Sequence, residues 1–267
     1  MSAVGLAQPT VVERSTPMAG AIELVLDHPQ AARTATPGQF FQLAVSAPRT
    51  LLRRPYSLAW ADPARGRIGF IFNVVGAGSA WLASRHEGHL MDVLGPLGRG
   101  FEIEASGRPA VCIAGGLGVA VFPALVQALR AAGRPVLFLQ GARTASQLLP
   151  AARLDGADVL VSTDDGSAGL TGPVTRLLAS APLNDADFYV CGPTPMMSAV
   201  IDLAERREVP LARIQVALET PMGCGVGTCL GCAAPRRGGG YLLTCHDGPC
   251  VRADRIDWRR MEDAMHA

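Results

Sequence analysis

Four cysteines near the end of the chain have the spacing of an iron–sulfur site. Cys224, Cys229 and Cys232 follow one another as C-x4-C-x2-C, and Cys245 comes after twelve further residues. Thiolates in this plant-type spacing hold a 2Fe–2S cluster. Structural zinc is the competing interpretation, although such sites usually draw their cysteines from two close pairs. We therefore predict a 2Fe–2S cluster on these four thiols, and disfavour disulfides because the chain is large and shows no export signal.

Glycines alternate with the cysteines of this loop. They are Gly223, Gly225, Gly227 and Gly231. Glycine reaches positive φ at little cost, so the loop can fold over a cluster with its N–H groups directed at sulfur, where they offset the charge of four thiolates. Cys250 is an alternative fourth ligand. We favour Cys245, because a strand that ends in a cysteine is a stiffer support than the loop that leads to Cys250.

The composition excludes several classes of function. The chain has 267 residues, of which 49% are hydrophobic and 18% charged, so it has room for two globular domains and a small appendage. All 24 basic residues are arginine, so neither a Walker A lysine nor a Schiff-base lysine is present. The formal charge of +1 gives no basic excess for binding nucleic acid.

The ends and the cysteine content indicate where the protein works. Residues 1–10 lack the basic and apolar regions of a signal peptide, and no apolar run is long enough to cross a membrane. Seven cysteines then fit thiol or metal chemistry in a reducing compartment better than disulfides. We expect an intracellular, cytoplasmic protein.

The N-terminal part of the chain reads as strands separated by turns. Strands predicted over residues 21–26, 39–45 and 69–75 favour an antiparallel β-barrel. One extended segment carries Arg54, Tyr56 and Ser57, which can bind a phosphate, cover an aromatic ring and hydrogen-bond its edge; an ordinary strand with a core tyrosine is the alternative. Gly78 and Ser79 precede a predicted helix over residues 80–85, whose N-terminus would attract a diphosphate, and helix capping by Ser79 is compatible with that role.

From residue 107 strands alternate with helices. Strands are predicted over residues 109–114, 135–140, 158–162, 187–190 and 214–218, and helices over residues 119–132, 144–149, 171–179 and 195–207. This alternation predicts a parallel sheet with helices on both faces, whose ligands bind at the carboxyl ends of the strands. The run from Gly115 to Gly118 follows one strand, and Cys191 with Gly192 follows another. No acidic residue is placed at the end of the second strand, where Gln140 and Arg143 are nearest.

These segments, in this order, resemble the ferredoxin–NADP reductase superfamily. The segments are Arg54-Pro-Tyr-Ser57, Gly76-Ala-Gly-Ser79, Gly115-Gly-Leu-Gly118, Cys191-Gly-Pro193 and the cysteine loop. Within the superfamily the chain is similar to the electron-transfer subunits of NAD-dependent dihydroorotate dehydrogenases, whose cluster loop also ends in Cys-x-Asp-Gly-Pro. The likeness runs from about residue 11 to residue 250. It departs at Val121, where a proline is usual, and at Cys250, where valine is common.

The resemblance implies FAD in the barrel, NAD on the α/β part and a 2Fe–2S cluster facing a partner. It places Arg54 on the FAD diphosphate, and it makes Tyr56, on the isoalloxazine, and Ser57, at the N5 side, the expected catalytic residues. The other expected cofactor-binding residues are Pro55, Ile71, Phe72, Asn73, Gly78 and Ser79 for FAD, and Gly115, Gly116, Gly118, Cys191 and Gly192 for NAD. The expected metal ligands are Cys224, Cys229, Cys232 and Cys245.

The expected architecture is an antiparallel β-barrel over residues 8–104, a Rossmann-like parallel α/β domain over residues 105–218 and a small cluster domain over residues 219–267. The expected function is that of an oxidoreductase subunit in pyrimidine biosynthesis. It would pass electrons between an FMN-containing dihydroorotate dehydrogenase subunit, in a heterotetramer, and NAD+. The sequence leaves open NADP in place of NAD, a subunit of a sulfide dehydrogenase, hydrogenase or ferredoxin–NADP reductase complex, and a zinc-stabilised binding module.

Overall fold

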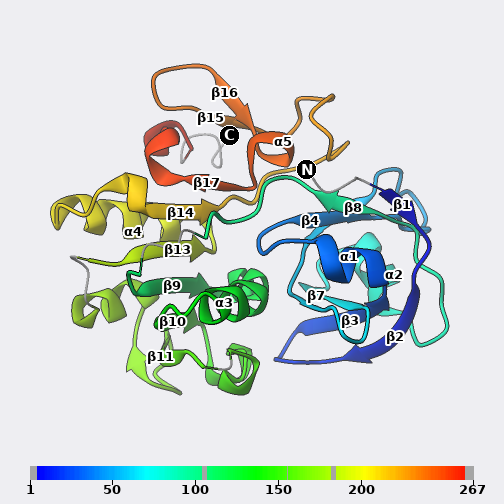
Figure 1. Cartoon of the computed structure of the whole chain (residues 1–267), viewed down its shortest axis with the longest axis horizontal. Helices are drawn as coiled ribbons and strands as arrows, with labels where there is room; N and C mark the ends of the chain where they lie inside the picture. The colour runs from blue at the N-terminus through cyan, green and yellow to red at the C-terminus, as the bar shows by residue number, and fades with distance from the viewer. Residues whose placement is uncertain (1–4, 104–106, 155, 182–184, 262–267) are drawn as a thin grey trace.

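The chain folds into a β-barrel and an α/β unit side by side, with the C-terminal segment lying across the top of both in Figure 1. The computed structural model describes residues 5–103, 107–154, 156–181 and 185–261. The predicted boundary between residues 104 and 105 and the predicted end of the cluster domain at residue 267 lie outside these ranges. The boundary between residues 218 and 219 stays a prediction.

The barrel consists of two four-stranded antiparallel sheets, with the orders β1-β8-β4-β5 and β2-β3-β7-β6. Its strands are β1 Gly5–Ala7, β2 Thr10–Ser15, β3 Ala21–Asp27, β4 Phe40–Leu43, β5 Arg54–Ser57, β6 Trp60–Asp62, β7 Arg67–Asn73 and β8 Val93–Leu97, joined by the helices α1 Pro29–Thr34 and α2 Ala77–Ala83. Successive side chains of a strand point to opposite faces, so alternate residues such as Leu24, Leu26, Phe70 and Phe72 fill one core. The predicted antiparallel barrel is confirmed.

The α/β unit is built on a seven-stranded sheet, counted over the described ranges, with the order β12-β11-β10-β9-β13-β14-β17. Its strands are β9 Ala110–Gly115, β10 Val136–Ala142, β11 Asp158–Thr163, β12 Leu170–Thr171, β13 Asp187–Cys191, β14 Ile214–Ala217 and β17 Cys250–Arg252. All neighbours are parallel except β14 and β17. The helices α3 Phe122–Ala131 and α4 Thr194–Arg206 pack into separate core clusters on the two faces. The predicted parallel sheet with helices on both faces is confirmed.

Two predicted helices are replaced by shorter elements. Residues 144–149 contain the 3-10 turn η2 Ala145–Gln147, and residues 171–179 contain the end of β12 and the 3-10 helix η4 Val174–Ser180. Proline disfavours the helical conformation of the residue before it, so Pro150 and Pro173 limit these helices. The predicted helix over residues 119–132 also begins as a 3-10 turn, η1 Gly116–Val121. The remaining 3-10 turns are η3 Ala151–Leu154, η5 Leu211–Arg213 and η6 Ala253–Arg255.

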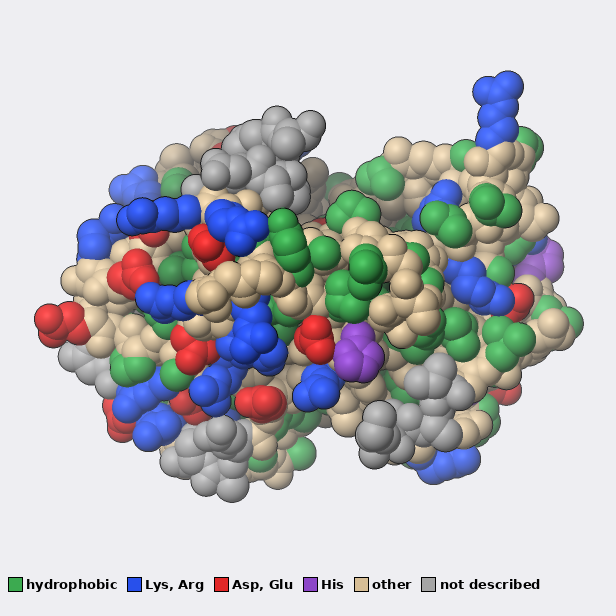
Figure 2. All heavy atoms as spheres, turned by 90° about the horizontal axis from the view of Figure 1, so that it is seen from above, with side chains coloured by type: hydrophobic (Ala, Val, Ile, Leu, Met, Phe, Trp, Pro, Cys, Tyr) green, Lys and Arg blue, Asp and Glu red, His purple; other side chains and the backbone are tan. Residues whose placement is uncertain are grey.

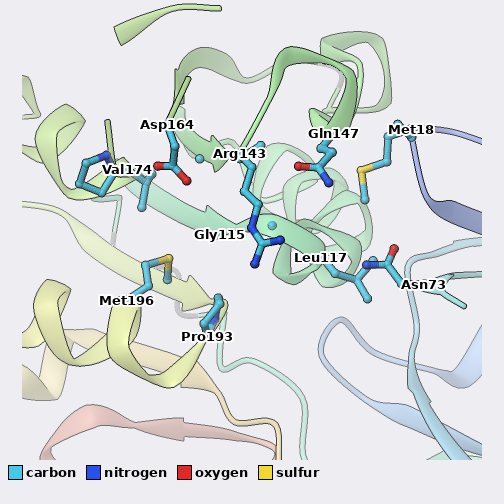
Figure 3. A pocket seen from close by; sticks show the side chains of 15 residues that line it. Met18, Asn73, Gly115, Leu117, Arg143, Gln147, Asp164, Val174, Pro193 and Met196 are labelled. Carbon is cyan, nitrogen blue, oxygen red and sulfur yellow. The ribbon is translucent and has the colours of Figure 1, made fainter. Parts of the chain in front are cut away.

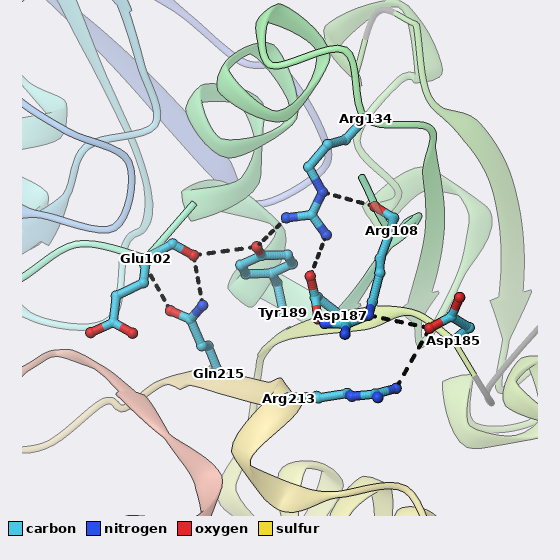
Figure 4. A network of polar contacts seen from close by, with 8 residues as sticks. All are labelled: Glu102, Arg108, Arg134, Asp185, Asp187, Tyr189, Arg213 and Gln215. Carbon is cyan, nitrogen blue, oxygen red and sulfur yellow. Dashed lines mark hydrogen bonds and ion pairs between the residues drawn. The ribbon is translucent and has the colours of Figure 1, made fainter. Parts of the chain in front are cut away.

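A polar network at the amino ends of the parallel strands connects the sheet to the barrel exit, the segment over residues 98–103 that follows β8 (Figure 4). The Arg134 side chain, 1% exposed, donates from Nη2 to Asp187 Oδ2 at 2.7 Å and from Nη1 to the Tyr189 hydroxyl at 3.1 Å. Its Nε donates to the Arg108 carbonyl at 2.9 Å. The Tyr189 hydroxyl donates in turn to the Glu102 carbonyl at 3.3 Å. The network therefore lies at the end of the sheet opposite the expected ligand sites.

The C-terminal segment ends by joining the main sheet. The hairpin β15 Ala233–Pro235 and β16 Tyr241–Leu243 is followed by the short helix α5 Thr244–Asp247. Strand β17 then pairs antiparallel with β14, with Ala217 opposite Cys250. The last strand predicted for this sheet ends at residue 218, so β17 was not predicted from the sequence. None of the helices in the described ranges is long and apolar enough to cross a membrane.

Candidate functional site

The strand order of the main sheet reverses at β9. Strands β10 and β11 continue on one side of it, whereas β13 and β14 lie on the other. At such a switch point the loops that leave the carboxyl ends diverge and open a crevice for a ligand. The glycine run after Gly115 borders this crevice from β9, and Cys191 borders it from β13, where it pairs with Ala114. The structure therefore brings the two predicted nucleotide segments together.

Gly118 packs directly on the end of β13. A Cβ at this position would lie 2.6 Å from the carbonyl carbon of Cys191 and 2.7 Å from the nitrogen of Gly192, closer than any real Cβ contact. A Cβ on Gly115 would likewise meet the sulfur of Met196. At Gly118 the obstructing atoms are backbone, so only glycine permits this approach, and the two segments form one continuous wall of the crevice.

A cavity of about 420 Å³ opens beside this wall (Figure 3). Its lining includes Asn73, Gly115, Gly116, Arg143, Gln147, Asp164, Pro193 and Met196. The Arg143 side chain reaches into the cavity from the end of β10. Asp164 directly follows β11, and its carboxylate also lines the cavity. A guanidinium can pair with a phosphate, and a carboxylate can accept a hydrogen bond from a ribose hydroxyl. The cavity therefore suits a nicotinamide nucleotide.

A second cavity, of about 200 Å³, lies between the barrel and the sheet. Its barrel side is formed by Phe40, Pro55, Tyr56, Ser57 and Ile71, and its sheet side includes Leu117, Gly118, Cys191, Glu219, Thr220 and Met222. The Tyr56 ring lies 4.8 Å from the Phe72 ring between centroids. Burial raises the pKa of the Tyr56 hydroxyl to about 12 and that of the Cys191 thiol to about 12, so both groups are neutral. A largely apolar slot with a few polar groups suits a planar heteroaromatic ring such as the isoalloxazine.

Three further predicted FAD residues, Arg54, Ser79 and Phe72, lie in different surroundings. The Arg54 guanidinium lies against α2, because a Cβ on Gly78 would be 2.8 Å from Arg54 Nε, and a positive charge at this point suits a diphosphate. The Ser79 hydroxyl accepts hydrogen bonds from the N–H groups of Val75 at 2.8 Å and Gly76 at 3.1 Å, so it caps its own helix. Phe72 points into the barrel core, away from both cavities.

Three residues that line the two cavities and follow later strands were not predicted from the sequence. Glu219 and Thr220 follow β14 and line the smaller cavity, and Asp164 follows β11 and lines the larger one. Their position directly after a parallel strand was the available signal, since ligands of such sheets bind at the carboxyl ends.

The cysteine loop holds two of its four thiols together. The sulfurs of Cys232 and Cys245 are buried and lie 3.2 Å apart. The Gly227 N–H donates to the Cys245 sulfur at 3.2 Å, and the Val226 N–H donates to the Cys224 sulfur at 3.4 Å. Gly227 has a φ of +84°, a conformation that favours glycine. The predicted inward N–H groups are therefore present.

Hydrogen bonding prepares Cys224 to act as a thiolate. The Thr228 hydroxyl and the N–H groups of Val226 and Cys229 lower the pKa of the Cys224 thiol to about 5. Burial and the neighbouring Cys232 raise the pKa of Cys245 to about 12. Within the described ranges no three His, Cys, Asp or Glu side chains converge on one metal ion. The donor set, with four thiols and N–H groups directed at sulfur, fits a cluster.

Cys250 lies apart from this set. It begins β17, where its buried sulfur faces the Gly38 carbonyl at 3.6 Å, and burial raises its pKa well above the usual value. The argument that Cys245 ends a strand is wrong, because Cys245 belongs to α5 and it is Cys250 that starts a strand. The choice of Cys245 as fourth ligand stays a prediction, now supported by its contact with Cys232.

Two family models match the chain. Residues 10–101 match the oxidoreductase FAD-binding domain, and residues 219–257 match the iron–sulfur cluster binding domain of dihydroorotate dehydrogenase B. The first range contains the barrel strands β2 to β8 with Arg54, Tyr56 and Ser57, and the second contains the cysteine loop. The predicted FAD and 2Fe–2S cofactors are thereby confirmed.

Known proteins resemble the chain over most of its length. The electron transfer subunit of dihydroorotate dehydrogenase B (NAD(+)) from Bacillus caldolyticus is 37% identical over 240 residues, which cover 88% of this chain and 91% of that protein. The same subunit from Geobacillus thermodenitrificans is 35% identical over 259 residues, covering 95% of this chain and 99% of that protein.

Two solved structures share the fold. A structure of NADH-dependent reduced ferredoxin-NADP oxidoreductase, described for flavin-based electron bifurcation, has a TM-score of 0.85 and 30% identity over 97% of this chain and 93% of its own. The ferredoxin reductase in carbazole 1,9a-dioxygenase has a TM-score of 0.69 and 25% identity over 80% of this chain and 69% of its own. With the switch-point crevice, the flavin slot and the cysteine loop in place, these similarities show that the chain belongs to the family of electron-transfer subunits of the NAD-dependent dihydroorotate dehydrogenase B.

Proposed function

We propose that this chain carries electrons between a catalytic subunit that oxidises dihydroorotate and NAD+, in pyrimidine biosynthesis. The observation that carries the proposal is that three candidate sites adjoin one another. Leu117 lines both the larger cavity, which we call the nucleotide cavity, and the smaller cavity, which we call the flavin cavity. Phe40 and Met222 line the flavin cavity and also pack with Cys232 and Cys245. Nucleotide, flavin and cluster therefore would follow one another with single side chains between them.

FAD, when bound, exchanges a hydride with NAD and single electrons with a 2Fe–2S cluster, so it belongs between the two. In the proposal Arg54 pairs with the diphosphate, Tyr56 covers the isoalloxazine and Ser57 hydrogen-bonds its edge. The wall of Gly118 and Cys191 brings the nicotinamide to the flavin slot. Buried apolar neighbours such as Phe40 keep water out of this slot.

The face that carries the cysteine loop suits a partner subunit. Figure 2 looks onto this face and shows apolar side chains gathered there. Val226 and Leu230 of the loop are exposed, as are Leu51 and Leu52, and Leu52 lies 3.9 Å from the position of a Cβ on Gly223. Exposed apolar groups of this kind mark protein interfaces. We propose an FMN-containing catalytic subunit as the occupant, in a heterotetramer, and a cytoplasmic location, which the free thiols of the chain support.

The test is reconstitution with the catalytic subunit of the same organism. The complex should reduce NAD+ when dihydroorotate is added. Cys229→Ser should abolish this activity while the purified chain keeps its FAD, because the substituted thiol is on the cluster loop and the flavin contacts are on the barrel. Undiminished activity of the Cys229→Ser complex would refute the relay.

A second candidate is a subunit of an NADH-dependent ferredoxin–NADP oxidoreductase. It is favoured by the structural similarity over 97% of the chain. This alternative predicts that reduced ferredoxin or NADPH, in place of dihydroorotate, drives NAD+ reduction once the matching partner is supplied. Assays of the natural complex, isolated through a tag on this chain, with each donor in turn decide between the two.

A further inference from the structure

Gln42 is a buried amide without a partner. It lies in β4, is 0% exposed, and neither its Oε1 nor its Nε2 has a hydrogen-bond partner among the described residues. Leaving such a group unpaired in the protein interior lowers stability, because its hydrogen bonds to water are lost and not replaced. Unsatisfied buried groups are few in native proteins, and each calls for an explanation such as a bound ion or ligand.

The alternation along β4 decides which way Gln42 points. Phe41 and Leu43 belong to the barrel core, whereas Phe40 packs with Cys232 and Cys245. Side chains two residues apart on a strand share a face. Gln42 therefore lies on the face of β4 that supports the cysteine loop.

The loop leaves room for the Gln42 amide at Gly225. A Cβ on Gly225 would lie 2.9 Å from Gln42 Nε2 and 2.8 Å from its Cγ, so a larger residue would displace the amide. Gly225 directly follows Cys224, and the next two N–H groups, of Val226 and Gly227, already donate to cysteine sulfurs. Gln42 Nε2 is thus a further donor beside the loop that carries these sulfurs, and it has no acceptor among the described residues.

We propose that the Gln42 amide donates a hydrogen bond to a sulfur of the 2Fe–2S cluster and thereby raises its reduction potential. The inference rests on the cluster that the proposed function assigns to this loop. Reduction adds one electron and one negative charge to the cluster, with no bond formed or broken. A donor to sulfur stabilises this added charge, so it favours the reduced form.

The test is an EPR-monitored redox titration of the holoprotein. Gln42→Met keeps the volume of the side chain and removes the donor. We expect its iron, sulfide and FAD contents to match the wild type, and its equilibrium constant for reduction to fall about tenfold, which is ~59 mV for a one-electron couple.

Gln39→Met is the matched control. Gln39 is also buried, but its Oε1 accepts from the Thr36 N–H at 2.9 Å and its Nε2 donates to the Gly98 carbonyl at 3.0 Å. Its amide is satisfied within the protein, so the cluster potential of Gln39→Met should equal that of the wild type.

An unchanged potential in Gln42→Met with a full cluster would overturn the inference and leave the proposed function intact. If that variant fails to assemble a cluster, pulsed EPR of reduced wild-type protein with 15N-labelled glutamine side chains decides. A 15N coupling supports the hydrogen bond, and its absence overturns it. A wild-type chain without iron and sulfide would overturn the cluster assignment together with the inference.

Discussion

Gly118→Ala should separate nucleotide chemistry from cofactor retention. A methyl group at this position would lie 2.6 Å from the carbonyl carbon of Cys191, whereas ordinary contacts begin at 3.4 Å. The obstructing atoms belong to the backbone of Cys191 and Gly192, so no side-chain rotation relieves the overlap. The glycine turn must therefore move away from the end of β13 by at least roughly 0.8 Å, the difference between these two distances, because the Cys191 carbonyl oxygen lies closer still.

The expected effect follows from the tolerance of reacting groups to misplacement. A shift of about 1 Å costs about 100-fold in rate, which corresponds to about 2.7 kcal/mol in the barrier. We expect flavin reduction by NADH to slow by a factor approaching ~100, measured as bleaching of the flavin absorption in an anaerobic stopped-flow experiment. FAD content should remain near the wild-type value, since Arg54, Tyr56 and Ser57 lie on the barrel.

Gly5→Ala is the control, because a Cβ at Gly5 meets no atom within 4 Å and β1 is extended. Chemical reduction by dithionite should be alike in the wild type and both variants, which shows that the flavin and the cluster are intact. Reduction of Gly118→Ala by NADH at the wild-type rate would refute the shared wall between the nucleotide and flavin sites.

Three further changes test the framework. Arg134→Met removes the shortest ion pair of the largely buried Asp187 carboxylate. The substitution should therefore lower the free energy of unfolding by about 3 kcal/mol and Tm by roughly 6–12 °C. An unchanged Tm in calorimetry would contradict this. Burial alone would raise the pKa of Glu23, but hydrogen bonds, chiefly from Arg153, outweigh it and lower the pKa below 4.5. The ion pair of Glu23 with Arg153 joins the barrel to the α/β unit. Its contribution to stability is therefore present above pH 4.5 and lost as the pH falls through the lowered pKa of Glu23. Glu23→Gln should flatten the acid side of the Tm profile, and parallel profiles would exclude the link. Cys250→Val should retain iron and sulfide, whereas their loss would make Cys250 a ligand.

The framework of the fold was predictable because its signals are local. The apolar runs that end at Gly115 and Cys191 each match one parallel strand, and a strand followed by glycine is visible without knowledge of its neighbours. The short spacing from Cys224 to Cys232 is equally local. The resemblance assigned Arg54 and Gly78 to one FAD site, but their contact was not visible in the residues themselves, since the two belong to different elements.

The missed features depend on distant contacts. Strand β17 has three residues, too few to show a period, and only its pairing with β14 makes it a strand. Gln42 falls in the predicted strand over residues 39–45, and nothing near it in the sequence shows that its face meets the cysteine loop. Cys245 was predicted to end a strand, yet the strand β16 stops at Leu243 and the chain turns into α5 at Thr244. In each case tertiary packing decides what local propensity leaves open.

The return of the chain to the main sheet explains how the cysteine loop keeps its place beside the flavin. The loop leaves the sheet after Ala217 and comes back at Cys250, and these two residues face each other across β14 and β17. The Leu218 N–H donates to the Pro249 carbonyl at 3.0 Å, and the Cys250 N–H donates to the Arg99 carbonyl of the barrel exit at 3.3 Å. The same short segment thus contacts the sheet and the barrel. A site built on paired strands holds its geometry better than one on free loops, so the cluster position is fixed relative to both cofactor cavities at once.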